Sequence, residues 1–185
     1  MKKQLGVRNC MYPMPTVLAG SNIDGKPNYC TVAYVGILDN SIISISLSKT
    51  RYTGAGIKQN GTFSVNYPPT SLVERADWCG IVSGRNEDKS AVFENFYGTL
   101  KTAPMIRECR LNMECRLERI IEFPGHDVFA GEIVETWCDE DCLSGAGVDF
   151  GKIDPMLFSS GGERGYWRLG ERFADPFSAG KNFKP

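Results

Sequence analysis

The feature that most limits how this chain can fold is a repeated alternation of apolar and polar side chains with a period of two. Segments 43–48, 63–67 and 111–117 each show it, with serine, asparagine or charged residues between large apolar ones. This period belongs to a β-strand that turns one face to a core and the other to solvent. Two further runs, 31–37 and 128–137, are rich in β-branched and aromatic residues, which favour strands. We therefore expect a chain built mainly of antiparallel strands.

Short connections join these strands. The Pro-Gly-His-Asp sequence at 124–127 separates two of the runs and predicts a hairpin between 111–117 and 128–137. Shorter apolar runs at 156–158 and 166–167 close the pattern near the end of the chain. Many strands joined in this way favour a closed or nearly closed antiparallel barrel.

Only two short helices are predicted. The first covers 52–60 and stops at the Asn-Gly pair 60–61, because glycine readily adopts the left-handed conformation that ends helices. The second begins at Ser71, which has the spacing of a capping box with Glu74, and runs to about Cys79. Both are short enough to be insertions between the strands of a barrel.

Composition and charge narrow the class of protein. The 185 residues, 42% hydrophobic and 23% charged, fit one globular domain. The formal net charge of -1 provides no general attraction for nucleic acid or anionic lipid, so we expect neither partner. No run approaches the ~18 apolar residues of a membrane span. Arg8, Asn9 and Pro13 interrupt the stretch after the basic start, so a cytoplasmic protein without a signal peptide is predicted.

Cysteine usage agrees with a reducing compartment. The seven cysteines are odd in number and contain no Cys-x-x-Cys pair, unlike a secreted disulfide framework. Structural thiols are the favoured interpretation. The alternatives are a metal or cluster site and redox-active thiols, with Cys30 and Cys79 as candidates for the redox role. His126 is the only histidine, which argues against a histidine-rich metal centre and leaves no spare base for a catalytic triad. We therefore predict no metal site.

One stretch of the chain combines several features of an anion-binding site. Ser46 and Ser48 share one face of a predicted strand, and Thr50, Arg51 and Thr53 follow where a helix begins. The N–H groups and dipole of a helix N-terminus favour a phosphate, hydroxyls add donors, and arginine grips two phosphate oxygens at once. The alternative is a well-capped helix with a surface arginine. The glycine-rich motifs of dinucleotide-binding and P-loop proteins are absent.

Further short motifs surround this stretch in a fixed order. They are Pro13-x-Pro15-x-Val17, Asp24-Gly-Lys-Pro-Asn28, Asn28-Tyr-Cys-Thr-Val-Ala33, Ser48-x-Thr50-Arg51-Tyr52, Asn60-Gly61, Cys79-Gly-Ile-Val-Ser-Gly84, Asp88-Lys89, Asn112-x-Glu114-Cys115, Gly125-His126-Asp127 and Tyr166-Trp167-x-Leu169-Gly170-Glu171. In order and spacing they resemble the flavoredoxin branch of the flavin reductase-like family, over nearly the whole chain. The resemblance implies a mainly β fold, an FMN-binding split β-barrel (a Greek-key antiparallel barrel) with a few short helices.

The resemblance also implies a homodimer. We expect the split-barrel domain to cover residues 1–172 and a C-terminal tail to cover 173–185. The tail carries Phe173, Phe177 and Phe183, which would expose apolar area if it were free. We therefore expect it to pack on the partner subunit.

The flavin-binding residues are implied by the same resemblance. Ser48, Thr50 and Arg51 would bind the FMN phosphate. Lys89 would approach the flavin and tune it at N1, with the phosphate as a second target and an exposed lysine as the plain alternative. His126 either donates to the flavin or closes the hairpin turn, and it would reach the site with Phe158, within the chain or across the dimer interface. The full predicted FMN-binding set is Asn28, Tyr29, Cys30, Thr31, Val32, Ala33, Tyr34, Ser46, Ser48, Thr50, Arg51, Lys89, His126 and Phe158.

Three hypotheses for function follow from this sequence. The leading one is an FMN-dependent oxidoreductase that takes hydride from NADH or NADPH and reduces free flavin or another small acceptor. The second is a flavoredoxin-type electron carrier with tightly bound FMN, a protein redox partner and no direct NAD(P)H activity. The third is a barrel-like binding module without redox chemistry. Hydride transfer needs little from the protein beyond placing the two rings together, so the sequence does not choose between the first two.

Overall fold

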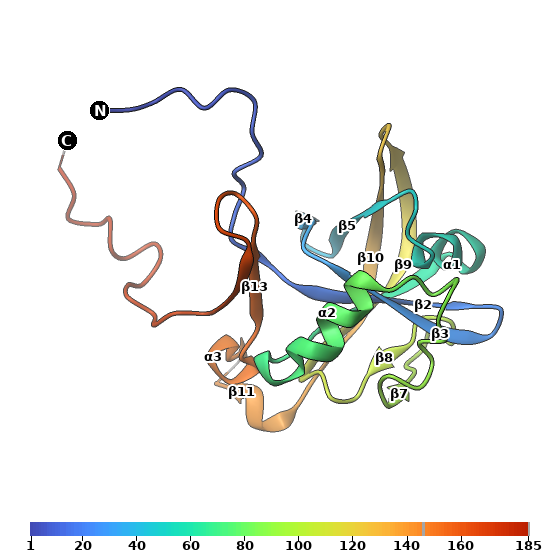
Figure 1. The fold of residues 1–185 in the computed structure, drawn as a ribbon. Coiled ribbons are helices and arrows are strands. Elements are labelled where there is room, and N and C mark those ends of the chain that lie inside the picture. The colour runs from blue at the N-terminus through green and yellow to red at the C-terminus, as the bar shows by residue number, and fades with distance from the viewer. Residues whose placement is uncertain (146, 185) are drawn as a thin grey trace.

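A computed structural model describes residues 1–145 and 147–184 of the chain (Figure 1). Its main element is a seven-stranded antiparallel sheet with the order β3-β2-β6-β9-β10-β5-β4. The strands are β2 (Val17–Ile23), β3 (Lys26–Val32), β4 (Val35–Asp39), β5 (Ile42–Ser48), β6 (Thr62–Tyr67), β9 (Leu111–Glu122) and β10 (His126–Cys138). The strands predicted at 43–48, 63–67, 111–117 and 128–137 are confirmed, and the last two form the predicted hairpin.

The seven-stranded sheet curls round on itself at Ala33 and Tyr34. Strands β3 and β4 lie at opposite edges of the sheet, and only these two residues separate them along the chain. The two edges must therefore come close together, and the carbonyl of Tyr34 accepts a hydrogen bond of 2.8 Å from the backbone N–H of Ser46 on β5. The prediction of one strand over 31–37 is wrong at this point, because the chain leaves one edge and joins the other. The result is the predicted split barrel.

A second, three-stranded sheet stands beside the split. It pairs β1 (Met14–Pro15) with β13 (Met156–Ser159) and β13 with β14 (Gly165–Arg168), which confirms the strands predicted at 156–158 and 166–167. Two short pairs complete the β structure. These are β7 (Asn95–Phe96) with β8 (Met105–Ile106), and β11 (Leu143–Ser144) with β12 (Gly147–Val148).

The helices are short, as predicted. They are α1 (Thr53–Asn60), α2 (Val73–Ile81), α3 (Phe150–Ile153) and the 3-10 turns η1 (Thr70–Leu72) and η2 (Glu140–Cys142). The first predicted helix is confirmed as α1, and it ends at Gly61, whose φ is 66° and whose N–H donates to Ile57. The capping box at Ser71 and Glu74 is wrong: Ser71 lies in η1, and α2 begins at Val73 with no side chain bonded to its N-terminus. No helix in the described part of the chain is long and apolar enough to cross a bilayer.

Three apolar clusters are buried in the described part of the chain, and the two larger ones position the elements around the split. One fills the barrel with alternate side chains of the strands, and its largest members, Phe63, Phe129 and Ile45, are fully buried. The other lies between α2 and the outer face of β2 and β3, where Tyr29 and Cys79 meet. Helix α2 is therefore fixed against the outer face of β3, next to the split.

The two ends of the chain project from this body. Residues 1–11 and 167–184 are exposed, and both ends extend away on the side of β13 (Figure 1). Phe173, Phe177 and Phe183 of the predicted tail are 98%, 97% and 77% exposed. The tail therefore has no packing surface on its own chain, and its predicted contact with a partner subunit stays a prediction. Pro185, its last residue, lies outside the described residues.

Candidate functional site

A large cavity opens where the barrel is split. Its volume is about 460 Å³, within the usual range for small-molecule sites. Three parts of the fold enclose it: segment 30–34 at the split, the paired ends of β5 and β10, and a second wall from α2 and the three-stranded sheet. The lining residues are Thr16, Cys30, Thr31, Val32, Ala33, Tyr34, Ser46, Leu47, Ser48, Arg51, Asp77, Gly80, His126, Phe158, Ser160, Arg164 and Tyr166.

Ser48 and His126 meet at this cavity because of the strand register. They are directly paired as the last residue of β5 and the first of β10. The imidazole of His126 lies 5.8 Å from the ring of Tyr34, with 35° between the ring planes. His126 thus lines the cavity and also begins β10 at the end of the hairpin turn. Both it and Phe158 reach the cavity within a single chain.

Arg51 occupies the junction of three hollows. It lines the large cavity, a hollow of about 130 Å³ against α1, and a hollow of about 210 Å³ against the loop after α2. Its Nη1 donates a hydrogen bond of 2.6 Å to the carbonyl of Gly80, and no carboxylate pairs with it in the described part of the chain. Guanidinium carries five N–H donors, so most of them are free for an anion. Arg51 is half-buried and α1 has no side-chain cap, unlike the alternative of a surface arginine on a capped helix, and the contact of Arg51 with a phosphate stays a prediction.

Most of the predicted residues that do not line the large cavity line the 210 Å³ hollow instead. Asn28, Thr50 and Lys89 line it, together with Cys30 and Arg51. The first residue of α1, Thr53, also reaches this hollow, but its buried hydroxyl accepts a hydrogen bond of 2.7 Å from Asn28. The Thr53 hydroxyl therefore helps to position Asn28 and has less capacity left for a ligand.

Lys89 is a buried cation. Only 3% of it is exposed, and its Nζ donates to the carbonyls of Tyr29 at 3.0 Å and Cys79 at 2.8 Å. Burial lowers the pKa of Lys89 from its ordinary value. The plain alternative of an exposed lysine is wrong. Lys89 does not line the large cavity, but it lines the smaller hollow together with Arg51.

Tyr29 differs from its neighbours in the predicted ring-binding segment. Its side chain is fully buried in the cluster under α2, and its hydroxyl donates to Asn95. Residues Cys30 to Tyr34 line the large cavity, but Tyr29 does not. The contact expected of Tyr29 with the flavin is through its main chain, and it stays a prediction, since the alternation of β3 turns only the side chain away.

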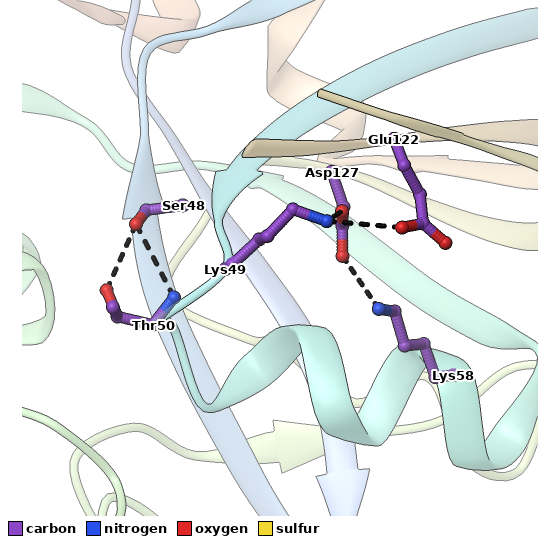
Figure 2. A network of polar contacts seen from close by, with 6 residues as sticks. All are labelled: Ser48, Lys49, Thr50, Lys58, Glu122 and Asp127. Atoms are coloured by element: carbon purple, nitrogen blue, oxygen red, sulfur yellow. Dashed lines mark hydrogen bonds and ion pairs between the residues drawn. The ribbon is translucent and has the colours of Figure 1, made fainter. Parts of the chain in front are cut away.

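A basic rim of lysine and arginine side chains lines the hollow against α1. Figure 2 shows two of them, Lys49 and Lys58, paired with Asp127. The carboxylate of Asp127, 6% exposed, accepts hydrogen bonds from Lys49 at 2.6 Å and Lys58 at 2.7 Å. These two bonds lower the pKa of Asp127. Beside them, Ser48 and Thr50 place their hydroxyl oxygens 3.0 Å apart.

Arg85 completes this rim and was not predicted from the sequence. Its Nη1 donates to the carbonyl of Thr50 at 3.1 Å, and its guanidinium lies 4.9 Å from the ring centre of Tyr52. It lines the same hollow as Lys49, Arg51 and Lys58. Asp127 already pairs with Lys49 and Lys58, so Arg51 and Arg85, which have no ion-pair partner in the described residues, are the cations that favour an anion here. The only signal for Arg85 was its position in the Ser-Gly-Arg sequence after α2.

The second wall of the large cavity was also missed. Its Asp77 on α2 accepts a hydrogen bond of 2.7 Å from the hydroxyl of Tyr166 on β14. Burial, and then this bond, raise the pKa of Tyr166. Thr16 lies next to them in the lining, and its hydroxyl is the one buried side-chain polar atom without a partner in the described residues. A ligand in the cavity would supply that partner.

The cysteines fit the structural interpretation. Cys30 lines the large cavity but is 2% exposed, and burial raises its pKa. Burial raises the pKa of Cys79 to about 11 and that of Cys115 to about 12. A thiol that stays protonated is a poor nucleophile at neutral pH, so neither candidate has the character of a reactive cysteine.

The comparison with known families agrees with this geometry. A family profile described as "Flavin reductase like domain" matches residues 8–165. The chain belongs to the flavin reductase-like family. The resemblance seen in the motifs is thereby confirmed.

Two flavoredoxin structures match nearly the whole chain, and a curated relative matches two thirds of it. The crystal structure of a flavoredoxin from Methanosarcina acetivorans matches with a TM-score of 0.92 and 40% identity, over 97% of this chain and 98% of that one. Flavoredoxin of Desulfovibrio vulgaris (Miyazaki F) matches with a TM-score of 0.89 and 38% identity, over 98% and 100%. An uncharacterized protein of Archaeoglobus fulgidus is 34% identical over 131 residues, 67% of this chain and 72% of its own.

Proposed function

We propose that this member of the flavin reductase-like family binds FMN in the large cavity and uses it to pass electrons from NADH or NADPH to a small acceptor or to free flavin. The observation that carries the proposal is the position of Arg51, whose free N–H donors face hollows that open from the cavity. Two named flavoredoxins resemble the chain over almost their whole length. The site also offers a ligand an unpartnered buried hydroxyl at Thr16.

The residues present fit FMN at both of its ends. Arg51, Ser48 and Thr50 would hold the phosphate, with Arg85 adding positive charge at the same rim. Segment 30–34 would lie along the ring, between the ends of the curled sheet. His126 lines the cavity and Lys89 lines the adjoining hollow, and a donor beside N1 would favour the reduced ring. When bound, FMN would supply the exchange of a hydride and of single electrons.

The alternative is an electron carrier with tightly bound FMN and a protein redox partner, which is favoured by the similarity to flavoredoxins. The two functions differ in one measurement. Purified, FMN-loaded protein is mixed anaerobically with NADH or NADPH, and the visible flavin absorbance is followed by stopped flow. Bleaching within seconds at micromolar protein supports the oxidoreductase. A flavin that stays oxidised with both nucleotides, but bleaches with dithionite, supports the carrier.

We also propose that the protein is a cytoplasmic homodimer. Ile37 and Leu38 on the edge strand β4 are 84% and 55% exposed, and the tail phenylalanines add further apolar surface. Such area is typical of a surface that a second copy covers. The cysteines are free, as in a reducing compartment. Light scattering of the full chain and of a chain truncated after residue 172 tests the role of the tail: the truncated chain is expected to dissociate at higher concentration.

A further inference from the structure

Tyr12 lies across the exposed end of the large cavity. Segment 30–34 forms one side of this end, and the hairpin of β13 and β14 forms the other side, with Phe158 and Arg164. Tyr34 and Arg164 are exposed, so we call this end the mouth of the cavity. Tyr12 is half-buried and is not a lining residue, but its neighbours on both sides of the mouth are. It therefore contacts the walls of the cavity from outside.

The β1–β13 pairing attaches Tyr12 to the hairpin side of the mouth. Strand β1 is antiparallel to β13, and its register, continued by two residues, places Tyr12 opposite Ser160. The rings of Tyr12 and Phe158 meet edge to face, with 6.1 Å between their centres and 80° between their planes. The ring of Tyr12 also packs on the backbone of Gly161, where a Cβ would come within 3.3 Å of it. Tyr12 is therefore held by the three-stranded sheet.

A hydroxyl contact joins Tyr12 to the other side of the mouth. Its oxygen lies 3.3 Å from the hydroxyl oxygen of Tyr34, whose ring lies 5.8 Å from that of His126. The hydroxyls of Ser160 and Tyr34 lower the pKa of Tyr12, while Tyr12 raises the pKa of Tyr34. This is the result expected when Tyr34 donates the hydrogen bond and Tyr12 accepts it. Tyr12 thus connects the two sides of the mouth.

Tyr12 is free to leave its contact with Tyr34. Residues 1–11 before it are exposed and extend away from the body on the side of β13 (Figure 1). The two hydroxyls meet at the surface, where water competes for both and a hydrogen bond contributes little. Exposed side chains change rotamer on the order of nanoseconds, which is far faster than the binding of a ligand. The contact can therefore break and re-form many times before one ligand binds.

We propose that Tyr12 is a gate residue for the large cavity, which is closed while Tyr12 contacts Tyr34 and open when that contact breaks. The inference rests on the proposed function, since FMN is the ligand that passes the gate. A ligand enters and leaves through the same mouth, so the closed form slows both steps. Tyr12 does not line the cavity, so the ligand has the same affinity for the closed and the open form. Loss of the gate therefore raises both rate constants by one factor and leaves the dissociation constant unchanged.

Stopped-flow fluorescence measures both rate constants. Apoprotein is mixed with FMN or riboflavin at several concentrations to obtain the association rate constant. Flavin-loaded protein is mixed with an excess of an unrelated apoflavoprotein, which traps released flavin, to obtain the dissociation rate constant. Tyr12→Phe loses the bond to Tyr34 and is expected to raise both constants about 2–10-fold. Tyr12→Ala also loses the edge contact with Phe158 and is expected to raise them about 5–100-fold.

The control is Met11→Ala, because that neighbour is 74% exposed, and it is expected to change neither rate constant. A merely structural role for Tyr12 gives a different result: the dissociation rate constant alone rises, so affinity falls, and the melting temperature falls with it. That result would overturn the gate. Tyr12→Phe keeps the ring, so it decides the matter if Tyr12→Ala does not fold, and unchanged rate constants in Tyr12→Phe would also overturn the gate. If wild-type protein binds neither flavin, the proposed function fails and the gate with it, whereas normal flavin binding with unchanged rate constants overturns the gate alone.

Discussion

The guanidinium of Arg51 and the carbonyl oxygen of Gly80 are joined by a hydrogen bond of 2.6 Å, which ties the chain before α1 to the end of α2. This bond fixes the direction of the side chain at the junction of three hollows. A long side chain loses much conformational entropy when it binds a ligand, and one that is already held loses less. The site is therefore organised before any ligand arrives.

Lys89 is expected to be a structural cation as well as a neighbour of the site. Lys89→Met should lower the free energy of unfolding by about 2 kcal/mol, because the buried carbonyls of Tyr29 and Cys79 lose their donor. Urea unfolding measures this loss. The matched control is Lys101→Met, because that lysine is exposed. An equal effect of both substitutions would contradict the structural role.

The pH dependence of stability gives a second signature of Lys89. Burial lowers its pKa in the folded chain, so the folded state binds fewer protons there than the unfolded state as the pH nears the ordinary value of about 10.4. The free energy of unfolding of wild type, relative to Lys89→Met, should therefore rise as the pH approaches that value. A difference between the two proteins that stays constant with pH would count against the burial of the charge.

Asp127 is expected to contribute stability that acid removes. Its pKa is lowered in the folded chain by Lys49 and Lys58, so the contribution is complete above the unfolded value of about 3.9 and is lost as the pH falls through the folded value. Asp127→Asn should lower the melting temperature at pH 7 by several degrees and flatten the acid limb of the stability curve. Glu122→Gln is the control, since that carboxylate is 71% exposed and 3.3 Å from Lys49. Similar curves for both variants would contradict the account.

Position 84 requires a glycine because its backbone lies close to the side chain of Asn28. A Cβ at this position would overlap the side-chain amide of Asn28, which is buried and bonded to Thr53 at 2.7 Å. Gly84→Ala should therefore displace Asn28 and weaken FMN binding about tenfold, together with a loss of stability of about 1–3 kcal/mol. Fluorescence titration with FMN measures the first effect. Gly170 has open space around it, so the control Gly170→Ala should change neither FMN affinity nor stability. If Gly84→Ala also changes neither quantity, the contact between Gly84 and Asn28 is not tight.

The thiols are expected to be unreactive except for one. Cys10 is exposed, whereas the others are buried or half-buried and form no disulfide in the described residues. A thiol reagent at pH 8 should therefore label about one cysteine rapidly in folded protein and all of them in urea. Rapid labelling of Cys30 or Cys79 in the folded state would restore the redox-active interpretation.

The strands were predictable where one face meets the core and the other does not. Ile45 and Leu47 are buried, while Ser46 between them is less buried, and the alternation in the sequence reflects this difference. Strand β2 gave no such signal, because all residues of Val17–Ile23 are buried and a strand buried on both faces has no alternation. The break at Ala33 and Tyr34 was missed for another reason: it depends on which strands pair, and a local pattern contains no information about pairing.

The residues of the candidate site also fall into those that the sequence predicted and those that it did not. Ser48, Thr50 and Arg51 are close in sequence, so their spacing predicted an anion site that the structure brings together with His126. Asp77 and Tyr166 are 89 positions apart and meet only because the three-stranded sheet stands against α2. Such pairs leave no trace in a single sequence.

The most direct test of the account is the affinity of Arg51→Ala for two flavins that differ only in the phosphate. FMN and riboflavin are titrated into apoprotein of wild type, Arg51→Ala and the exposed control Arg119→Ala. If Arg51 holds the phosphate, Arg51→Ala weakens FMN about 10–100-fold and riboflavin hardly at all, because a charge-assisted hydrogen bond is lost only with FMN. Equal losses for the two flavins, or no loss for either, would contradict the central claim.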